Sequence, residues 1–130
     1  MKLIAKISFL LLFVPTATAH PPEQILTHLK VSYAPGPKLR GVASWYGEEV
    51  AGQLMANGEP FDPYRMTAAS YQLPLGTRVR VLNVRNGRAV IVTITDRGPN
   101  KRLHRTIDLS ELAAIRLGFK REGLTLVKVF

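Results

Sequence analysis

The chain has 130 residues, a formal charge of +9 and no cysteine. This length supports one compact domain with its own core but hardly two, and without cysteine the chain has no disulfide framework and no thiol to lipidate. The positive charge favours anionic partners. Nucleic acid is not the expected partner, because the aromatic residues are not interleaved with the basic ones as base-stacking surfaces require.

Residues 1–19 have the pattern of a signal peptide. Lys2 and Lys6 precede the apolar run ISFLLLFV, and Ala17 and Ala19 form an A-x-A cleavage site. The apolar run is too short for a membrane-spanning helix. Cleavage would leave 111 residues with a charge of +7. We therefore expect an exported, soluble, monomeric protein of the bacterial periplasm or cell envelope, without lipidation and without an integral membrane segment.

Residues 20–40 contain four prolines and no sustained period, so they are predicted to be an N-terminal arm or linker. The domain is predicted to cover residues 41–130. Asn86-Gly87 separates two apolar-alternating runs and is a strong hairpin signal. The predicted strands lie within GVASWY (41–46), GTRVRVLNV (76–84), GRAVIVTITD (87–96) and GLTLVKVF (123–130).

One helix is predicted from about 110 to 117, where apolar residues fall at helical spacing. Asp108 or Ser110 can cap its start, and Gly118 can end it. A second short helical turn is predicted near 67–71. The pattern as a whole predicts a small, mostly antiparallel β-domain of barrel type with one helix packed on it.

Two acidic residues lie where loops could form a cleft. Asp96 belongs to TDRGP (95–99), directly after an apolar strand, and Glu59 lies in the long polar loop 56–79. Long loops on small barrels are either functional or disordered, and a pair of carboxylates is what cleavage of a glycosidic bond needs. The alternative is ordinary turn chemistry at Asp96 and a solvated loop acid at Glu59.

Other side chains have two interpretations each. Trp45 and Tyr46 could stack on sugar rings, or Trp45 could belong to the core. The arginines that flank the Asn86-Gly87 turn could form a solvated strand face or bind an anionic glycan; they are Arg78, Arg80, Arg85 and Arg88. The histidines show no metal-ligand spacing, so no metal and no cofactor are expected; they are His20, His28 and His104.

Six motifs in this order carry a family resemblance. The series resembles that of the rare lipoprotein A (RlpA) family of peptidoglycan lytic transglycosylases and covers residues 41–130. The resemblance implies a six-stranded double-psi β-barrel with one or two short helices, similar to expansins and family 45 glycoside hydrolases. The motifs are GVASWYG (41–47), ANGEPFD (56–62), MTAAS (66–70), LPLGTRVRVLNVRNGR (73–88), TDRGP (95–99) and IDLSELAAIRLG (107–118).

The resemblance also implies a reaction. The β-1,4 bond between N-acetylmuramic acid and N-acetylglucosamine of peptidoglycan strands is cleaved without water, which leaves a 1,6-anhydro end. The family's catalytic aspartate matches Asp96, and its second functional acid matches Glu59. We expect Asp96 to act first as acid and then as base, and Glu59 to orient the substrate or stabilise the charged transition state. The alternative function is a non-catalytic, expansin-like barrel that binds glycan or loosens the wall.

Substrate-binding roles are expected for five residues of the matched motifs. They are Trp45, Tyr46, Asn57, Ser70 and Arg97. Arg97 lies next to Asp96, and a nearby cation lowers the pKa of an acid, so we expect its side chain to point to the opposite face of the strand.

The sequence departs from the family's pattern at two positions. Ser70 stands where a histidine is usual, and Met55 stands where a threonine is common. A serine cannot carry the positive charge of an imidazolium group, so the departure at Ser70 bears on activity or substrate positioning.

Overall fold

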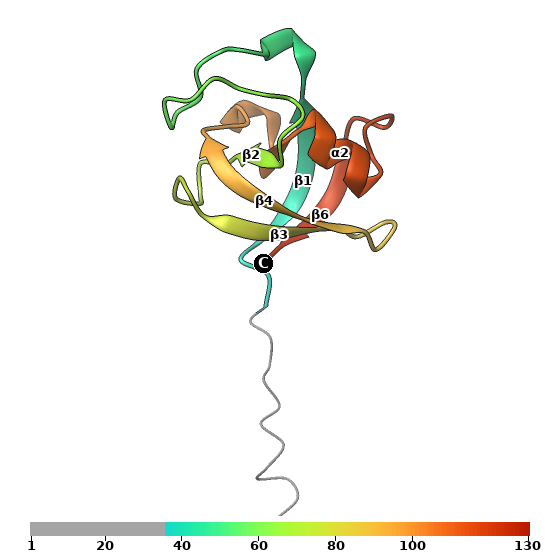
Figure 1. The fold of residues 1–130 in the computed structure, drawn as a ribbon. Helices are drawn as coiled ribbons and strands as arrows, with labels where there is room; N and C mark the ends of the chain where they lie inside the picture. The colour runs from blue at the N-terminus through green and yellow to red at the C-terminus, as the bar shows by residue number, and fades with distance from the viewer. Residues whose placement is uncertain (1–35) are drawn as a thin grey trace, which may run out of the picture. The chain divides into compact units, whose positions relative to one another are not determined.

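The computed structural model describes residues 36–130, so the predicted signal peptide, most of the predicted arm, His20 and His28 lie outside the described residues. Six strands form a closed barrel in the order β1-β5-β2-β4-β3-β6 (Figure 1). This confirms the predicted fold class, with one α-helix and two 3-10 turns. The elements are β1 (Leu39–Tyr46), η1 (Glu48–Val50), β2 (Thr67–Ala69), β3 (Arg78–Asn83), β4 (Ala89–Asp96), η2 (Lys101–Leu103), β5 (Ile107–Ser110), α2 (Glu111–Leu117) and β6 (Thr125–Val129).

The four strands predicted from alternation are β1, β3, β4 and β6. In β3 and β6 each buried residue is followed by a more exposed one, as a strand with one face on a core requires. The predicted hairpin joins β3 to β4. Gly87 has φ 74° and donates its backbone N–H to the carbonyl of Asn83 at 2.9 Å. Strand β1 begins at Leu39, two residues before the predicted start.

The predicted helix is α2. Ser110 is its N-cap, with Oγ accepting the backbone N–H of Ala113 at 3.3 Å, and Gly118 ends it with φ 78°. Its inner face, including Ala113 and Leu117, is fully buried in the core. Of the two predicted capping residues, Ser110 therefore caps the helix, and Asp108 is free for another role.

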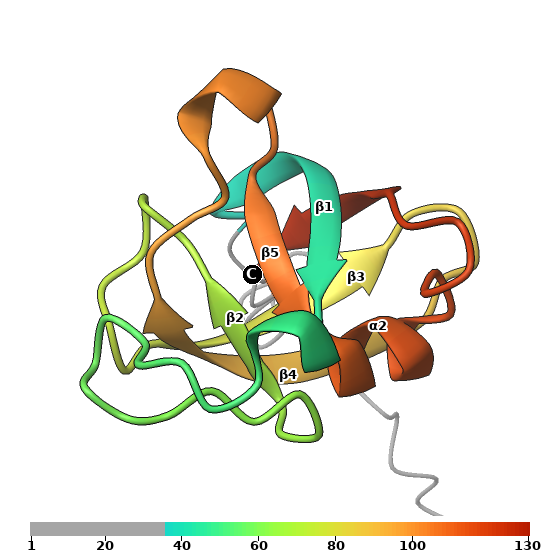
Figure 2. The same cartoon turned by 90° about the horizontal axis from the view of Figure 1, so that it is seen from above.

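The helical turn predicted near 67–71 is wrong. Residues 67–69 form strand β2, which lies between β4 and β5, parallel to the first and antiparallel to the second (Figure 2). Three residues are too few to show a strand period, and pairing with two neighbours decides the conformation of Thr67 and Ala68 over any local preference. Strand β5 (107–110) has four residues, and it was not predicted from alternation either.

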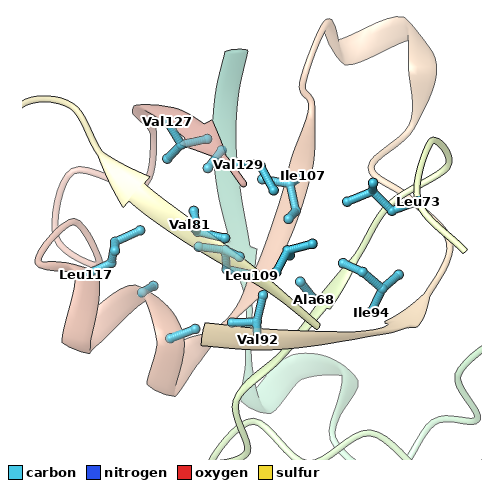
Figure 3. Packing of buried hydrophobic residues seen from close by; sticks show 14 of the residues in the cluster. Ala68, Leu73, Val81, Val92, Ile94, Ile107, Leu109, Leu117, Val127 and Val129 are labelled. Carbon is cyan, nitrogen blue, oxygen red and sulfur yellow. The ribbon is translucent and has the colours of Figure 1, made fainter. Parts of the chain in front are cut away.

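The core fills the inside of the barrel with aliphatic side chains from every strand and from α2 (Figure 3). Because the chain alternates faces along each strand, polar residues next to these core positions lie on the outer face. No helix within residues 36–130 combines the length and the hydropathy needed to cross a bilayer. The labelled core residues are Ala68, Leu73, Val81, Val92, Ile94, Ile107, Leu109, Leu117, Val127 and Val129.

Candidate active site

A row of register partners across four neighbouring strands brings two aspartates together. Ser44 on β1 pairs with Asp108 on β5, Asp108 pairs with Ala69 on β2, and Ala69 pairs with Asp96 on β4. Register partners point to the same face of a sheet. The two aspartates are therefore two strand spacings apart, about 10 Å between Cα atoms, with the small side chain of Ala69 between them.

A bulge in β4 places Asp96 in this row. Ala68 pairs with Ile94, but the next residue, Ala69, pairs with Asp96, so Thr95 has no partner on β2. A bulge of this kind adds one residue to a strand and redirects the side chain that follows it. Without it, the partner of Ala69 would be Thr95.

Three members of the row, Ala69, Asp96 and Asp108, line a cavity of about 250 Å³. One wall comes from the segment that follows η1, where Gly52 and Phe61 are linked by a backbone hydrogen bond of 2.8 Å. This wall lies beside the two aspartates, which are half-buried. The lining residues are Tyr46, Val50, Gln53, Leu54, Met55, Phe61, Ala69, Asp96, Arg97 and Asp108.

Asp96 is held by backbone donors. Its Oδ1 accepts the N–H of Ala56 at 2.9 Å and the N–H of Arg97 at 2.8 Å. Two amide donors on one oxygen stabilise a negative charge there. The first of these bonds also fixes the wall segment to the end of β4, together with the bond from the N–H of Asn57 to the carbonyl of Thr95 at 3.1 Å.

Asp108 lies in a different environment. Burial raises its pKa, and this outweighs the Ser44 hydroxyl, which donates to Oδ1 at 2.8 Å, and the charge of Arg105, both of which lower it. The negative charges of Glu49 and Asp96 raise it further. The cavity thus contains one carboxyl that accepts two backbone amides and one whose pKa is raised by burial. Two carboxyls in different environments are what acid–base chemistry uses.

Tyr46 completes the cavity. Its ring packs on Phe61 with 4.4 Å between centroids, and its hydroxyl is buried without a hydrogen-bond partner within residues 36–130. Burial and the charges of Asp96 and Asp108 raise its pKa, so the hydroxyl stays protonated. An unpaired buried donor is costly, and an acceptor atom of a ligand in the cavity could pair with it.

Glu59 does not line this cavity. It lies in an adjoining cavity of about 320 Å³, and Met55 lines both. The side chain of Glu59 accepts from Asn57 Nδ2 at 3.3 Å, and Asn57 Oδ1 accepts the N–H of Glu59 at 3.0 Å. Both residues are exposed. They therefore face a neighbouring part of the same surface, next to the aspartate row.

Arg97 and Ser70 form hydrogen bonds that hold the loop after β2, next to the cavity. Arg97 lines the cavity, but its Nη1 donates to the carbonyls of Ser70 at 2.7 Å and Leu73 at 2.6 Å, so the guanidinium is directed to that loop. Ser70 is fully buried, and its Oγ accepts the N–H of Gln72 at 3.2 Å. The structure does not bring Ser70 to the cavity as a substrate contact; it stabilises the turn after β2.

Trp45 also lies away from the cavity. Its neighbour Tyr46 faces the site, and adjacent strand residues point to opposite faces. Trp45 packs against the core cluster, donates from Nε1 to the carbonyl of Lys120 at 3.1 Å, and has Lys120 Nζ over its ring at 5.6 Å. The interpretation of Trp45 as a core residue is therefore the one that this packing supports.

Sequence reasoning missed Asp108 as a site residue. The segment 107–110 alternates apolar and polar residues, and both apolar residues, Ile107 and Leu109, are fully buried. This period of two was the available signal that Asp108 and Ser110 share the opposite face of a strand. Among the described residues, no group of three or more His, Asp or Glu side chains is arranged to hold a metal ion.

Fold and site together define a double-psi β-barrel with two aspartates in one cleft. Residues 38–129 match the family described as lytic transglycolase. The endolytic peptidoglycan transglycosylase RlpA of Pseudomonas aeruginosa is 48% identical over 103 residues, which cover 79% of this chain and 30% of that protein. A probable endolytic peptidoglycan transglycosylase RlpA from Nostoc is 46% identical over 113 residues, which cover 85% of this chain and 29% of that protein.

The chain therefore belongs to the RlpA-like family, and it spans about 30% of the length of these relatives. Among solved structures, an expansin from Clavibacter michiganensis is similar with TM-score 0.54 and 25% identity, covering 70% of this chain and 48% of that one. A Streptomyces papain inhibitor has TM-score 0.51 and 24% identity, covering 72% and 96%. These two likenesses support the barrel fold.

Proposed function

We propose that this protein is a peptidoglycan lytic transglycosylase that cleaves the β-1,4 bond between N-acetylmuramic acid and N-acetylglucosamine and leaves 1,6-anhydro ends. The observation that carries the proposal is that Asp96, Ala69 and Asp108 are register partners and line one cleft. The two acids have different environments, and the chain belongs to a family of such enzymes.

Asp108 is the proton donor in this mechanism. Burial raises its pKa, so it can hold a proton and give it to the O4 oxygen of the leaving N-acetylglucosamine. The bond between C1 of the muramic residue and O4 then breaks, and positive charge develops at C1. This differs from the prediction from sequence, which gave both proton transfers to Asp96.

Asp96 stabilises that positive charge and acts as the base. The C6 hydroxyl of the muramic residue attacks C1, the C1–O6 bond forms, and the hydroxyl proton passes to the Asp96 carboxylate. Water is not consumed. Proton return from Asp96 to Asp108 through solvent restores both groups for the next turnover.

The remaining residues bind the glycan on either side of the reacting bond. Tyr46 presents a protonated hydroxyl to the cavity, and Glu59, which is hydrogen-bonded to Asn57, offers a carboxylate in the adjoining cavity. The pattern of residues 1–19 supports export to the cell envelope, where peptidoglycan is found. An expansin-like binding role remains as the outcome in which glycan binds and no bond is cleaved.

The test is digestion of purified peptidoglycan, intact and stripped of stem peptides, in water enriched in ¹⁸O. We expect 1,6-anhydro-muramyl ends without incorporated ¹⁸O. An increase in the number of reducing ends, without 1,6-anhydro ends, would identify a hydrolase instead. Binding to both substrates without new ends would support the expansin-like alternative.

A further inference from the structure

A third cavity, of about 350 Å³, is formed by chain segments next to the two aspartates. Its lining includes Gly98, two residues after Asp96, and Thr106, two residues before Asp108. It therefore adjoins both aspartates along the chain. Its lining also includes Tyr71, Gln72, Pro99, Lys101 and Arg105.

This cavity is cationic. Lys101 and Arg105 line it, and no carboxylate does. Within residues 36–130 the ion pair between Lys120 and Glu111 is the one salt bridge, so neither Lys101 nor Arg105 has a carboxylate partner there. Lys101 Nζ lies 5.2 Å from the centroid of the Tyr71 ring, which holds the ammonium group over an aromatic face.

The cavity is also electrostatically coupled to the reacting centre. The charge of Arg105 acts on the carboxyl of Asp108 and lowers its pKa. The cavity that adjoins the aspartate cavity is lined by Glu59, Asp62 and a single arginine, Arg65. The two cavities therefore differ in charge, since one is lined by cations and the other mainly by carboxylates.

We propose that the pocket formed by Tyr71, Gln72, Lys101 and Arg105 binds the carboxylate carried by the C3 substituent of a muramic residue, and so fixes which sugar lies on this side of the reacting bond. The inference rests on the proposed function for its substrate class. N-acetylglucosamine has a free hydroxyl at C3 in place of the lactyl ether, so the two sugars of the strand differ in the group that this pocket selects. Lys101 and Arg105 would donate charge-assisted hydrogen bonds to the carboxylate.

The carboxylate that this pocket would bind can come from two sources. In glycan stripped of stem peptides the carboxylate belongs to the lactyl group itself, whereas in intact peptidoglycan the lactyl carbonyl is part of an amide and the carboxylates belong to the peptide. Binding of each form is therefore measured separately. Chitotetraose, which has the same β-1,4 N-acetylglucosamine backbone and no carboxylate, is the control ligand.

The experiment is calorimetric titration of the full chain with stripped glycan tetrasaccharide, with its peptide-bearing counterpart and with chitotetraose. Lys101→Gln and Arg105→Gln should each weaken binding of at least one carboxylate-bearing ligand about tenfold and change chitotetraose binding less than about twofold. The ligand whose binding is weakened identifies the source of the carboxylate. Arg102→Gln is the matched control, since Arg102 lies in the same loop and does not line the cavity.

Two results would overturn the proposal. One is equal weakening for chitotetraose and the carboxylate-bearing ligands, which would mean general damage to the groove. The other is unchanged binding of all ligands by Lys101→Gln and Arg105→Gln. Binding does not require turnover, so a charge-dependent affinity in a protein that forms no 1,6-anhydro ends would retain this inference and reject the proposed function.

Discussion

Replacing Asp96 by asparagine and by alanine separates its chemical role from its structural one. Its Oδ1 accepts two backbone N–H groups, from Ala56 at 2.9 Å and from Arg97 at 2.8 Å. Asparagine keeps an acceptor oxygen in the same place but loses the charge. Alanine loses the acceptor as well, and with it the bond that fixes the wall segment at Ala56 to β4.

The expected changes in the free energy of unfolding follow from these two hydrogen bonds. Hydrogen bonds to charged groups contribute about 1.5–3 kcal/mol each, but Ala56 and Arg97 are exposed, so their freed amides regain water and the loss is smaller. We expect Asp96→Ala to lower the free energy of unfolding by about 2 kcal/mol and Asp96→Asn by about 0.5–1 kcal/mol. Both variants should lose activity by a factor of roughly 100 or more.

Stability is measured by urea unfolding followed through the fluorescence of Trp45, the one tryptophan of the chain. Activity is measured as the initial rate at which 1,6-anhydro ends form. Equal stability of the two variants, within about 0.5 kcal/mol, would refute the anchoring of the wall segment by Oδ1. Retained activity in Asp96→Asn would refute the need for its charge.

Three further perturbations test other parts of the site. The pKa of Asp108 is raised in the folded protein above its ordinary 3.8. Ionisation of Asp108 therefore lowers the free energy of unfolding as the pH rises above that value. Asp108→Asn should unfold at a higher urea concentration than the wild type at pH 7, and this difference should vanish near pH 3. Tyr46→Phe removes a buried hydroxyl without a partner and should raise the free energy of unfolding by up to about 1 kcal/mol while glycan affinity falls; a loss of stability would show that the hydroxyl is paired. Trp45→Phe should leave kcat/KM within about twofold because the ring lies outside the cleft, and a larger loss would return Trp45 to the substrate site.

Several features of the fold could be predicted from the sequence because local signals were strong. The Asn86-Gly87 turn, the alternation in β3 and β6, and the cap at Ser110 each have a direct physical cause in neighbouring residues. Strand β2 could not be predicted in this way. Its three residues are held by pairing with β4 and β5, and neither neighbour is close to it in the chain.

The candidate site could also be predicted only in part, because it too depends on pairing between strands that are distant in the chain. Asp96 follows a clear strand and could be selected, but its alignment with Asp108 depends on the bulge at Thr95 and on β2 lying between the two acids. The pairing of Asp96 with Glu59 was predicted from their positions in two separate loops and from the family resemblance. The structure places Glu59 in the adjoining cavity and Asp108 in the shared one, because register across strands decides which side chains meet.

The most direct test of the proposed mechanism compares wild type, Asp108→Asn and Glu122→Gln in the formation of 1,6-anhydro-muramyl ends from purified peptidoglycan, read by mass spectrometry. Glu122 is exposed and lies outside the aspartate cavity, so its variant controls for the loss of one negative charge. If Asp108 is the proton donor, the rate falls by a factor of roughly 100 or more in Asp108→Asn and stays near that of the wild type in Glu122→Gln. Formation of these ends by Asp108→Asn at the wild-type rate would contradict the assignment.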